Sequence, residues 1–283
     1  MTNAPGVRAR ALTIAGSDSG AGAGIQADLK TFAALGVYGS SAITAVTVQN
    51  TLGVNGYQEM SPEIVAGQID AVMEDIGAQA VKTGMLASAA IVEAVSERSR
   101  HWRMDRLVVD PVMVAKGGDR LLREDAVEAI QRSLLPLAFV VTPNIPEAEV
   151  LSGRSIESEA DMEEAARAIA ALGPRYVVVK GGHREDEPID VVFDGSKIHR
   201  LSSPRVETTN THGTGCTFSA AISAGLAIGH EPLTAIARAK AFLYHALEES
   251  YAIGGGHSPV NHFYALWRCL EEPEPIRSMR KES

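Results

Sequence analysis

One segment of this sequence has residues of the kind and spacing that bind phosphate. Residues Thr211–Thr217 read Thr-His-Gly-Thr-Gly-Cys-Thr, and the small residues of a predicted helix follow at once. Glycines just before a helix let successive backbone N–H groups converge on one point, where the helix N-terminus adds positive potential. The segment therefore predicts an anion-binding hole. The alternative interpretation is a tight loop that only packs closely against the helix.

Six other segments rich in glycine or polar side chains follow predicted strands. They are residues 16–24, 49–50, 83–85, 110–118, 142–147 and 180–183. Ligands of open parallel sheets bind beyond the carboxyl ends of the strands, so we expect these segments to meet at one edge. Asn144 and Glu147 supply oxygen ligands of the kind that hydrated Mg²⁺ prefers, unless they only begin a helix.

Other phosphate-binding and metal-binding motifs are disfavoured or absent. Residues 22–27 match the loose dinucleotide pattern, but they lie well beyond the predicted strand, and Gln49 stands where an acidic ribose ligand is expected. The sequence contains no Gly-Lys pair, which excludes a P-loop. No two histidines are spaced i, i+4, and neither cysteine has a nearby cysteine partner, so a zinc site is not expected.

Composition narrows the class of protein. The 283 residues include 26 basic and 35 acidic side chains, a formal net charge of −9, which disfavours a nucleic-acid surface. An anionic ligand therefore needs positive potential supplied locally. The longest apolar stretch, Leu134–Val141, contains Pro136, so we expect no membrane-spanning segment. With only two cysteines, Cys216 and Cys269, a disulfide framework is ruled out and a cytoplasmic location is expected.

Short β-like runs alternate with helical periodicity along the chain. Strands are expected at residues 11–15, 41–48, 79–82, 106–110, 137–142 and 176–180, with a short β-hairpin at 189–193 and 197–201. Helices are expected between Pro62 and Gly77, at 89–99, at 125–135, after Pro146, at 158–172, and from 214 and 232, the last two closing the chain.

This alternation predicts an α/β fold with a mostly parallel central sheet and helices on both faces. No linker divides the pattern. We therefore expect a single domain over residues 1–283, with an ordered core from about 10 to 270 and polar terminal tails.

Several motifs together resemble one family. The segments on which the resemblance rests are residues 11–18, 24–32, 82–86, 110–113, 142–144, 180–183 and 211–216. In this order they are similar to hydroxymethylpyrimidine/phosphomethylpyrimidine kinases of thiamine biosynthesis, which have the ribokinase-like fold. The likeness spans about residues 10–265. It implies that ATP phosphorylates 4-amino-5-hydroxymethyl-2-methylpyrimidine, and that a second ATP phosphorylates the resulting monophosphate.

The resemblance also implies roles for particular residues. Gln49 reads the amino group and ring nitrogen of the pyrimidine, and the rest of that pocket is formed by Asp28, Met85, Val112 and the backbone of Gly16. The amides of Gly213, Thr214, Gly215 and Cys216 form the anion hole for the transferred phosphoryl group. Asn144 and Glu147 organise Mg²⁺ through water, and Lys180 and Thr211 lie near the nucleotide phosphates. ATP and Mg²⁺ are the implied cofactors, and a homodimer is the implied assembly.

Two positions depart from patterns seen in related enzymes. Cys216 stands where many ribokinase-like enzymes have an aspartate base, a replacement typical of the pyrimidine kinases and their pyridoxal-kinase relatives. A helix N-terminus lowers thiol pKa values, so Cys216 is expected to accept the proton of the substrate hydroxyl. Ala21 stands where the family usually has a glycine, which can adopt a positive φ.

Two alternative functions remain open on the sequence. A pyridoxal kinase of the same family would share the first glycine loop and the anion hole, but such enzymes usually lack the Gln49-Asn50 pair. A pyrimidine- or nucleotide-binding regulator without catalytic activity would need neither Mg²⁺ ligands nor an anion hole. The pair and the retained site motifs favour the pyrimidine kinase.

Overall fold

A nine-stranded sheet runs through the residues that this computed structural model describes, 8–113, 124–182 and 188–271. The strands are β1 (Arg10–Ser17), β2 (Tyr38–Asn50), β3 (Gly53–Glu59), β4 (Ala80–Thr83), β5 (Leu107–Val109), β6 (Val140–Val141), β7 (Tyr176–Val179), β8 (Ile189–Phe193) and β9 (Ile198–Ser202). Their order is β3-β2-β1-β4-β5-β6-β7-β8-β9, parallel from β2 to β7 and antiparallel at both edges. The predicted mostly parallel sheet and the β8–β9 hairpin are confirmed.

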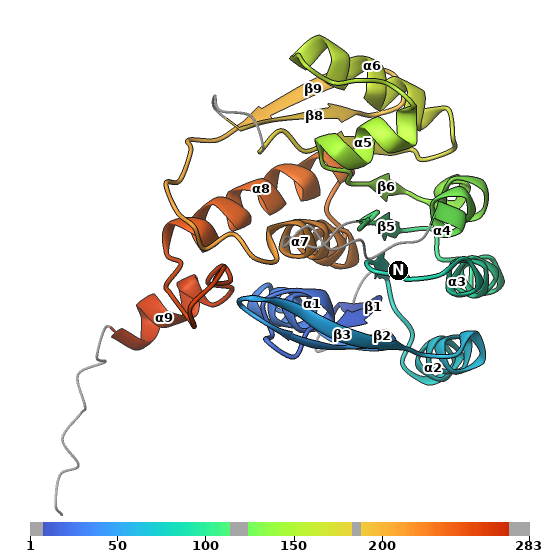
Figure 1. Cartoon of the computed structure of the whole chain (residues 1–283), viewed down its shortest axis with the longest axis horizontal. Helices are drawn as coiled ribbons and strands as arrows, with labels where there is room; N and C mark the ends of the chain where they lie inside the picture. The colour runs from blue at the N-terminus through green and yellow to red at the C-terminus, as the bar shows by residue number, and fades with distance from the viewer. Residues whose placement is uncertain (1–7, 114–123, 183–187, 272–283) are drawn as a thin grey trace, which may run out of the picture.

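Helices cover both faces of this sheet. They are α1 (Gly24–Ala34), α2 (Pro62–Asp75), α3 (Ala89–His101), α4 (Glu124–Ala129), α5 (Ile145–Ser152), α6 (Glu159–Ala170), α7 (Thr214–Ile228), α8 (Pro232–Glu248) and α9 (Tyr264–Glu271). α1, α7 and α8 lie on one face, and α2 to α6 lie on the other (Figure 1). None of these described helices is long and apolar enough to span a membrane.

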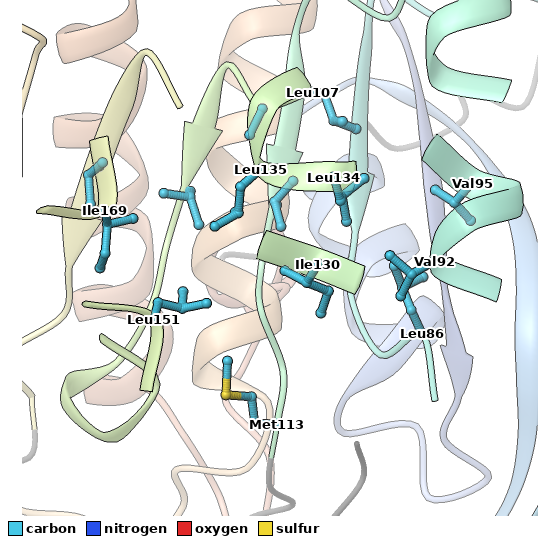
Figure 2. Packing of buried hydrophobic residues seen from close by; sticks show 14 of the residues in the cluster. Leu86, Val92, Val95, Leu107, Met113, Ile130, Leu134, Leu135, Leu151 and Ile169 are labelled. Atoms are coloured by element: carbon cyan, nitrogen blue, oxygen red, sulfur yellow. The ribbon is translucent and has the colours of Figure 1, made fainter. Parts of the chain in front are cut away.

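The core is divided by the sheet into two apolar clusters. Along β1, Leu12 and Ile14 belong to the cluster on the α2–α6 face, whereas Ala11 belongs to the cluster with α1, α7 and α8. Figure 2 shows part of the first cluster, in which Leu107 of β5 lies near Leu134 and Leu135. Because both faces are buried, the central strands are continuous apolar runs, which is why they could be recognised from the sequence.

Local capping signals were predicted correctly. The Ser61 side chain accepts a hydrogen bond from the Ile64 amide at 3.4 Å, and Pro62 occupies the first position of α2. Ser158 and Asp161 form the expected capping box of α6. These residues satisfy backbone amides that an isolated helix end would leave unpaired, so they fix where each helix begins.

Other predicted boundaries were wrong. A single helix was expected at 125–135. The α-helix, α4, ends at Ala129, and a π-helical turn, Ile130–Leu134, and a 3-10 turn, Leu135–Leu137, follow it. Pro136 explains the change because it has no N–H and its ring clashes with the preceding helical turn. The strand expected at 137–142 is correspondingly reduced to Val140–Val141. A third closing helix, α9, follows α8 and was not expected.

The second predicted strand was too short. β2 runs to Asn50 and pairs antiparallel with β3. This strand was not expected, because Gly53, Asn55 and Gly56 have low strand propensity. Gln49 and Asn50 are therefore the last two residues of β2, and do not form a segment after it.

Candidate active site

The polar segments predicted to meet do lie along one edge of the sheet. Backbone hydrogen bonds link neighbouring strand ends in sequence: Gly84 N donates to Ile14 O, Asp110 N to Thr83 O, Thr142 N to Val109 O and Lys180 N to Pro143 O, all at 2.9–3.0 Å. Residues 114–118 and His183 of these segments lie outside the described residues. The carboxyl ends of β1, β4, β5, β6 and β7 therefore form the floor of one site.

The first turn of α7 has the predicted anion-binding form. Gly213 is its N-cap with φ +76°, and the first intrahelical bond runs from Thr217 N to Gly213 O at 2.8 Å. The amides of Thr214, Gly215 and Cys216 precede that bond, so the helix itself provides them with no acceptor. A Cβ at residue 213 would lie 1.8 Å from the carbonyl oxygen of Gly22. Only glycine fits where these two loops meet.

A charge cluster of a half-buried Lys180 and a buried Asp110 lies directly beneath this turn. Lys180 Nζ contacts Asp110 Oδ1 at 3.2 Å, and Ser219 Oγ of α7 donates to Asp110 Oδ2 at 3.2 Å. A Cβ on Gly215 would be 3.4 Å from Lys180 Nζ. Burial alone would lower the pKa of Lys180, but Asp110 and then Glu147 outweigh it and raise that pKa. The ammonium group therefore stays charged beside the amides, which supplies local positive potential in an acidic protein.

Asn144 and Glu147 form the start of α5. The Asn144 side chain accepts a bond from Glu147 N at 2.9 Å, and Glu147 Oε2 accepts one from Asn144 N at 2.8 Å. The helix-start interpretation is thus confirmed, and the pair is a capping box. Burial raises the pKa of Glu147 to about 7, although Lys180 opposes this rise.

The donors near α5 fit a magnesium ion only in part. A buried carboxyl with a raised pKa would gain from a nearby cation, which favours its ionised form. The described residues nevertheless contain no cluster of three or more His, Cys, Asp or Glu side chains able to hold a metal. Asn144 and Glu147 can therefore supply only some of the ligands, and nucleotide phosphates and water would supply the others.

Asp28 does not line an open pocket as expected. It has no exposed surface; its Oδ2 binds Lys82 Nζ at 2.9 Å and accepts a bond from Thr13 Oγ1 at 2.6 Å. Lys82 is also fully buried, and the Asp28 carboxylate overcomes the effect of burial to raise the Lys82 pKa. Asp28 is therefore buried in an ion pair with Lys82 and is not exposed on a pocket wall.

The other predicted pocket residues are distributed along the same edge. Met85 is almost buried, and its Sδ would be 3.2 Å from a Cβ on Gly16, so these two residues are in contact as expected. Val112 is half-buried in the turn after β5, where its amide donates to Asp110 O at 2.8 Å. Thr211 is half-buried in the loop before Gly213. The structure thus brings Gly16 and Met85 together and places Val112 and Thr211 on adjoining segments.

Gln49 lies where three segments meet. Asp18 of the first glycine loop accepts bonds from the amides of Gly22 (3.0 Å) and Ala23 (2.8 Å), and its Oδ2 also lies 2.9 Å from His212 Nε2. Gln49 Nε2 is 3.4 Å from that same His212 nitrogen. Burial would raise the pKa of Asp18, but the His212 and backbone hydrogen bonds lower it below its ordinary value.

The expected pKa of Cys216 was wrong. Burial raises the pKa of this thiol to about 11, and the opposing effect of Lys82 is smaller. The prediction considered only the helix N-terminus. It omitted the desolvation that follows when α7 packs against the sheet, because that depends on residues far away in the sequence.

Four ionisable residues of the site were not predicted to have a role. They are Asp18, Lys82, Asp110 and His212. Lys82 and Asp110 carry a usable sequence signal: each is a charged residue at or just after an apolar strand that is buried on both faces. Such a charge is costly to bury unless it is paired or functional.

Ala21 in the first loop adopts the left-handed conformation that the family glycine would favour, with φ +60°. Ala21→Gly is expected to raise the free energy of unfolding by up to about 1 kcal/mol, because the left-handed strain of alanine exceeds the extra chain entropy of glycine. Chemical denaturation measures this change. The matched control is Ala129→Gly: Ala129 is helical with φ −64°, so this variant should be less stable than the parent, and a gain in both variants would contradict the strain argument.

Known proteins resemble this chain over most of its length. The sequence pattern of the phosphomethylpyrimidine kinase family matches residues 18–261. A hydroxymethylpyrimidine/phosphomethylpyrimidine kinase from Rhizobium meliloti is 53% identical over 262 residues, 91% of this chain and 98% of that protein. A thiamine biosynthesis bifunctional protein from Geobacter sulfurreducens is 52% identical over 93% of this chain, which spans only 54% of that longer protein.

A solved structure shares the fold. The ADP complex of Bacillus subtilis pyridoxal kinase superposes with a TM-score of 0.85 at 38% identity, covering 92% of this chain and 100% of the other. The family match extends from Asp18 to Asn261 and so includes the strand-end residues and the first turn of α7. This chain therefore belongs to the phosphomethylpyrimidine kinase family.

Proposed function

We propose that this protein transfers a phosphoryl group from ATP to the hydroxymethyl group of 4-amino-5-hydroxymethyl-2-methylpyrimidine, and a second one to the resulting monophosphate. The observation that carries this proposal is the first turn of α7, whose amides have no acceptor within the helix and lie beside the charged Lys180–Asp110 pair. Phosphoryl transfer needs mainly alignment and stabilisation of charge on the transferred group, and these residues supply both. Family membership supports the choice of substrate and of ATP.

The two steps make different demands on the protein. In the first, the hydroxymethyl oxygen forms a bond to the γ-phosphorus, the bond to ADP breaks, and the hydroxyl proton must leave. The thiolate form of Cys216, at the third position of α7, is the proposed acceptor of that proton and becomes the neutral thiol. In the second, the nucleophile is already an anionic phosphate oxygen, so no base is needed. Mg²⁺ bound with ATP, held through water by Asn144 and Glu147, would neutralise phosphate charge.

A substrate panel tests the proposal. It contains the pyrimidine alcohol, its monophosphate, pyridoxal and pyridoxine, each with ATP and Mg²⁺. The proposal expects turnover of the first two and much weaker turnover of the pyridoxal compounds. Preference for pyridoxal would favour the second candidate function, a pyridoxal kinase. The structural similarity to a pyridoxal kinase is the observation behind this alternative. Binding of the pyrimidine without turnover would favour the regulator.

Gln49 is the proposed basis of this selectivity, since a primary amide pairs with both an amino group and a ring nitrogen. Gln49→Met is expected to slow transfer to the pyrimidine alcohol about ten- to a hundredfold, because it removes pairing worth roughly 1–3 kcal/mol. Turnover of pyridoxal should be unchanged or higher. The matched control, Gln58→Met, changes an exposed residue of β3 and should affect neither substrate. Equal losses on both substrates in Gln49→Met would make Gln49 a structural residue.

We infer a homodimer from the family resemblance and from the outer edge of the sheet. β2, β3 and the turn between them carry large apolar side chains that are 43–74% exposed: Val46, Val48, Leu52 and Tyr57. An exposed group of this kind is typical of a protein interface. Light scattering should give a particle of twice the chain mass of 30.0 kDa, and Val48→Glu should shift it towards the monomer. A monomer at micromolar concentration in the parent protein would contradict this. The single-domain organisation and cytoplasmic location stay predictions.

A further inference from the structure

One imidazole nitrogen of His212 has two neighbours, a carboxylate and the Gln49 amide group, that it cannot hydrogen-bond at the same time. Nε2 of His212 lies 2.9 Å from Asp18 Oδ2 and 3.4 Å from Nε2 of Gln49. If this imidazole nitrogen carries a proton, it donates to the carboxylate but faces a second donor, the amide NH₂. If it carries none, it can accept from the amide but then directs a lone pair at an acceptor-only carboxylate.

The surroundings of Asp18 decide between these two states. Its carboxylate already accepts bonds from the amides of Gly20, Gly22 and Ala23, which favour the ionised form. An ionised Asp18 requires a donor at His212 Nε2, so the imidazole must be protonated there. Rotation of the Gln49 amide by 180° keeps its shape and turns Oε1, an acceptor, towards this N–H group.

We propose that the Asp18–His212 pair is a specificity device that fixes the orientation of the Gln49 amide, with Oε1 towards His212 and Nε2 left as a donor. This inference rests on the proposed function. Oε1 has a second lone pair that can accept from the 4-amino group of the pyrimidine, while Nε2 donates to the neighbouring ring nitrogen. A 4-oxo analogue, with a carbonyl oxygen and a protonated ring nitrogen, presents the opposite pattern and meets two mismatched pairs.

His212 is held independently of Gln49, so it can impose this orientation. Its amide donates to Ser258 O at 3.1 Å, and its ring packs so closely on Gly22 that a Cβ there would lie 2.3 Å from His212 Cδ2. The backbone of Gln49 is fixed separately, since its N–H donates to Ser19 Oγ at 2.8 Å and its carbonyl oxygen accepts from the same hydroxyl at 2.6 Å. The side-chain amide of Gln49 can therefore still rotate, and His212 restricts this rotation.

The test compares kcat/KM for the 4-amino substrate and its 4-oxo analogue in matched variants. His212→Leu keeps an apolar side chain of similar size over Gly22 but removes the donor, whereas His212→Gln retains a terminal N–H donor. The parent enzyme should prefer the 4-amino compound at least a hundredfold, and His212→Leu should reduce this ratio about tenfold or more, since the amide can then rotate. His212→Gln should keep most of the ratio. General damage to the α7 loop would slow both substrates equally and leave the ratio unchanged.

A ratio that stays the same in His212→Leu would overturn the inference while leaving the proposed function intact. Turnover of neither compound by the parent enzyme would instead remove the proposed function, and the inference with it. Nitrogen NMR of the imidazole in the unaltered protein gives an answer even if a variant does not fold. A proton on His212 Nε2 is expected; the neutral tautomer protonated only at Nδ1 would overturn the inference.

Discussion

Gly213→Ala is expected to lower the rates of both phosphorylation steps by at least about a hundredfold. A Cβ at this position would lie 1.8 Å from Gly22 O, and the residue has φ +76°, so alanine both collides with backbone and is strained. The loop must move, and the amides of Thr214, Gly215 and Cys216 move with it. Loss of one well-placed oxyanion donor costs about 10²–10³ in kcat in other enzymes, and here the whole group is displaced.

The opposite end of the same helix provides the control. Gly229 caps α7 with φ +104°, but a Cβ there would meet nothing within 4 Å. Gly229→Ala should therefore lower the free energy of unfolding by about 1–2 kcal/mol through strain alone, with both kcat values unchanged. Steady-state kinetics and thermal unfolding separate the two effects. Near-normal rates in a folded Gly213→Ala protein would contradict the assignment of the anion hole to α7.

Cys216→Ser is expected to slow the first phosphorylation about 10²–10³-fold and the second only slightly. A positioned general base contributes about 10²–10⁴ in rate, and only the first nucleophile carries a proton to remove. Serine keeps the backbone amide of residue 216, so the anion hole is retained. Quenched-flow or coupled assays with the alcohol and with the monophosphate measure the two steps separately.

The raised thiol pKa gives this prediction a specific pH dependence. With a pKa of about 11, Cys216 is mostly protonated near neutrality, and its thiolate fraction rises about tenfold with each pH unit below that value. If the thiolate is the base, kcat/KM for the alcohol rises with pH in the free enzyme, while the Cys216→Ser enzyme lacks this rise. Equal slowing of both steps, or a flat profile in the parent enzyme, would count against the base role.

Local signals in the sequence predicted the architecture well. The buried strands β5 and β7 are apolar runs, β1 and β4 are partly so, and Ser61 and Ser158 cap their helices through residues three positions away. β3 was missed because none of its residues is buried, so it has no apolar pattern to detect. The break after α4 depends on how Pro136 is accommodated by its neighbours. α9 was also missed, and its Leu266 is 54% exposed.

The residue types of the site could be predicted, but their partners could not. The Lys82–Asp28 pair joins residues 54 positions apart, and the Asp18–His212 pair joins residues 194 positions apart. Such contacts exist only after the sheet has assembled, and they determine pKa values through burial and charge. This is why Asp28 was assigned to the pocket wall when it is buried behind it, and why the pKa of Cys216 was expected to be low.

Phosphorus NMR of the protein with ATP, Mg²⁺ and 4-amino-5-hydroxymethyl-2-methylpyrimidine tests the central claim most directly. The proposed chemistry predicts that the resonance of a monophosphate ester appears first, and that the paired resonances of a diphosphate ester follow, with one equivalent of ADP released at each step. A spectrum in which ATP persists and neither ester forms would contradict the proposed activity. A monophosphate that accumulates without further reaction would contradict the second phosphorylation alone.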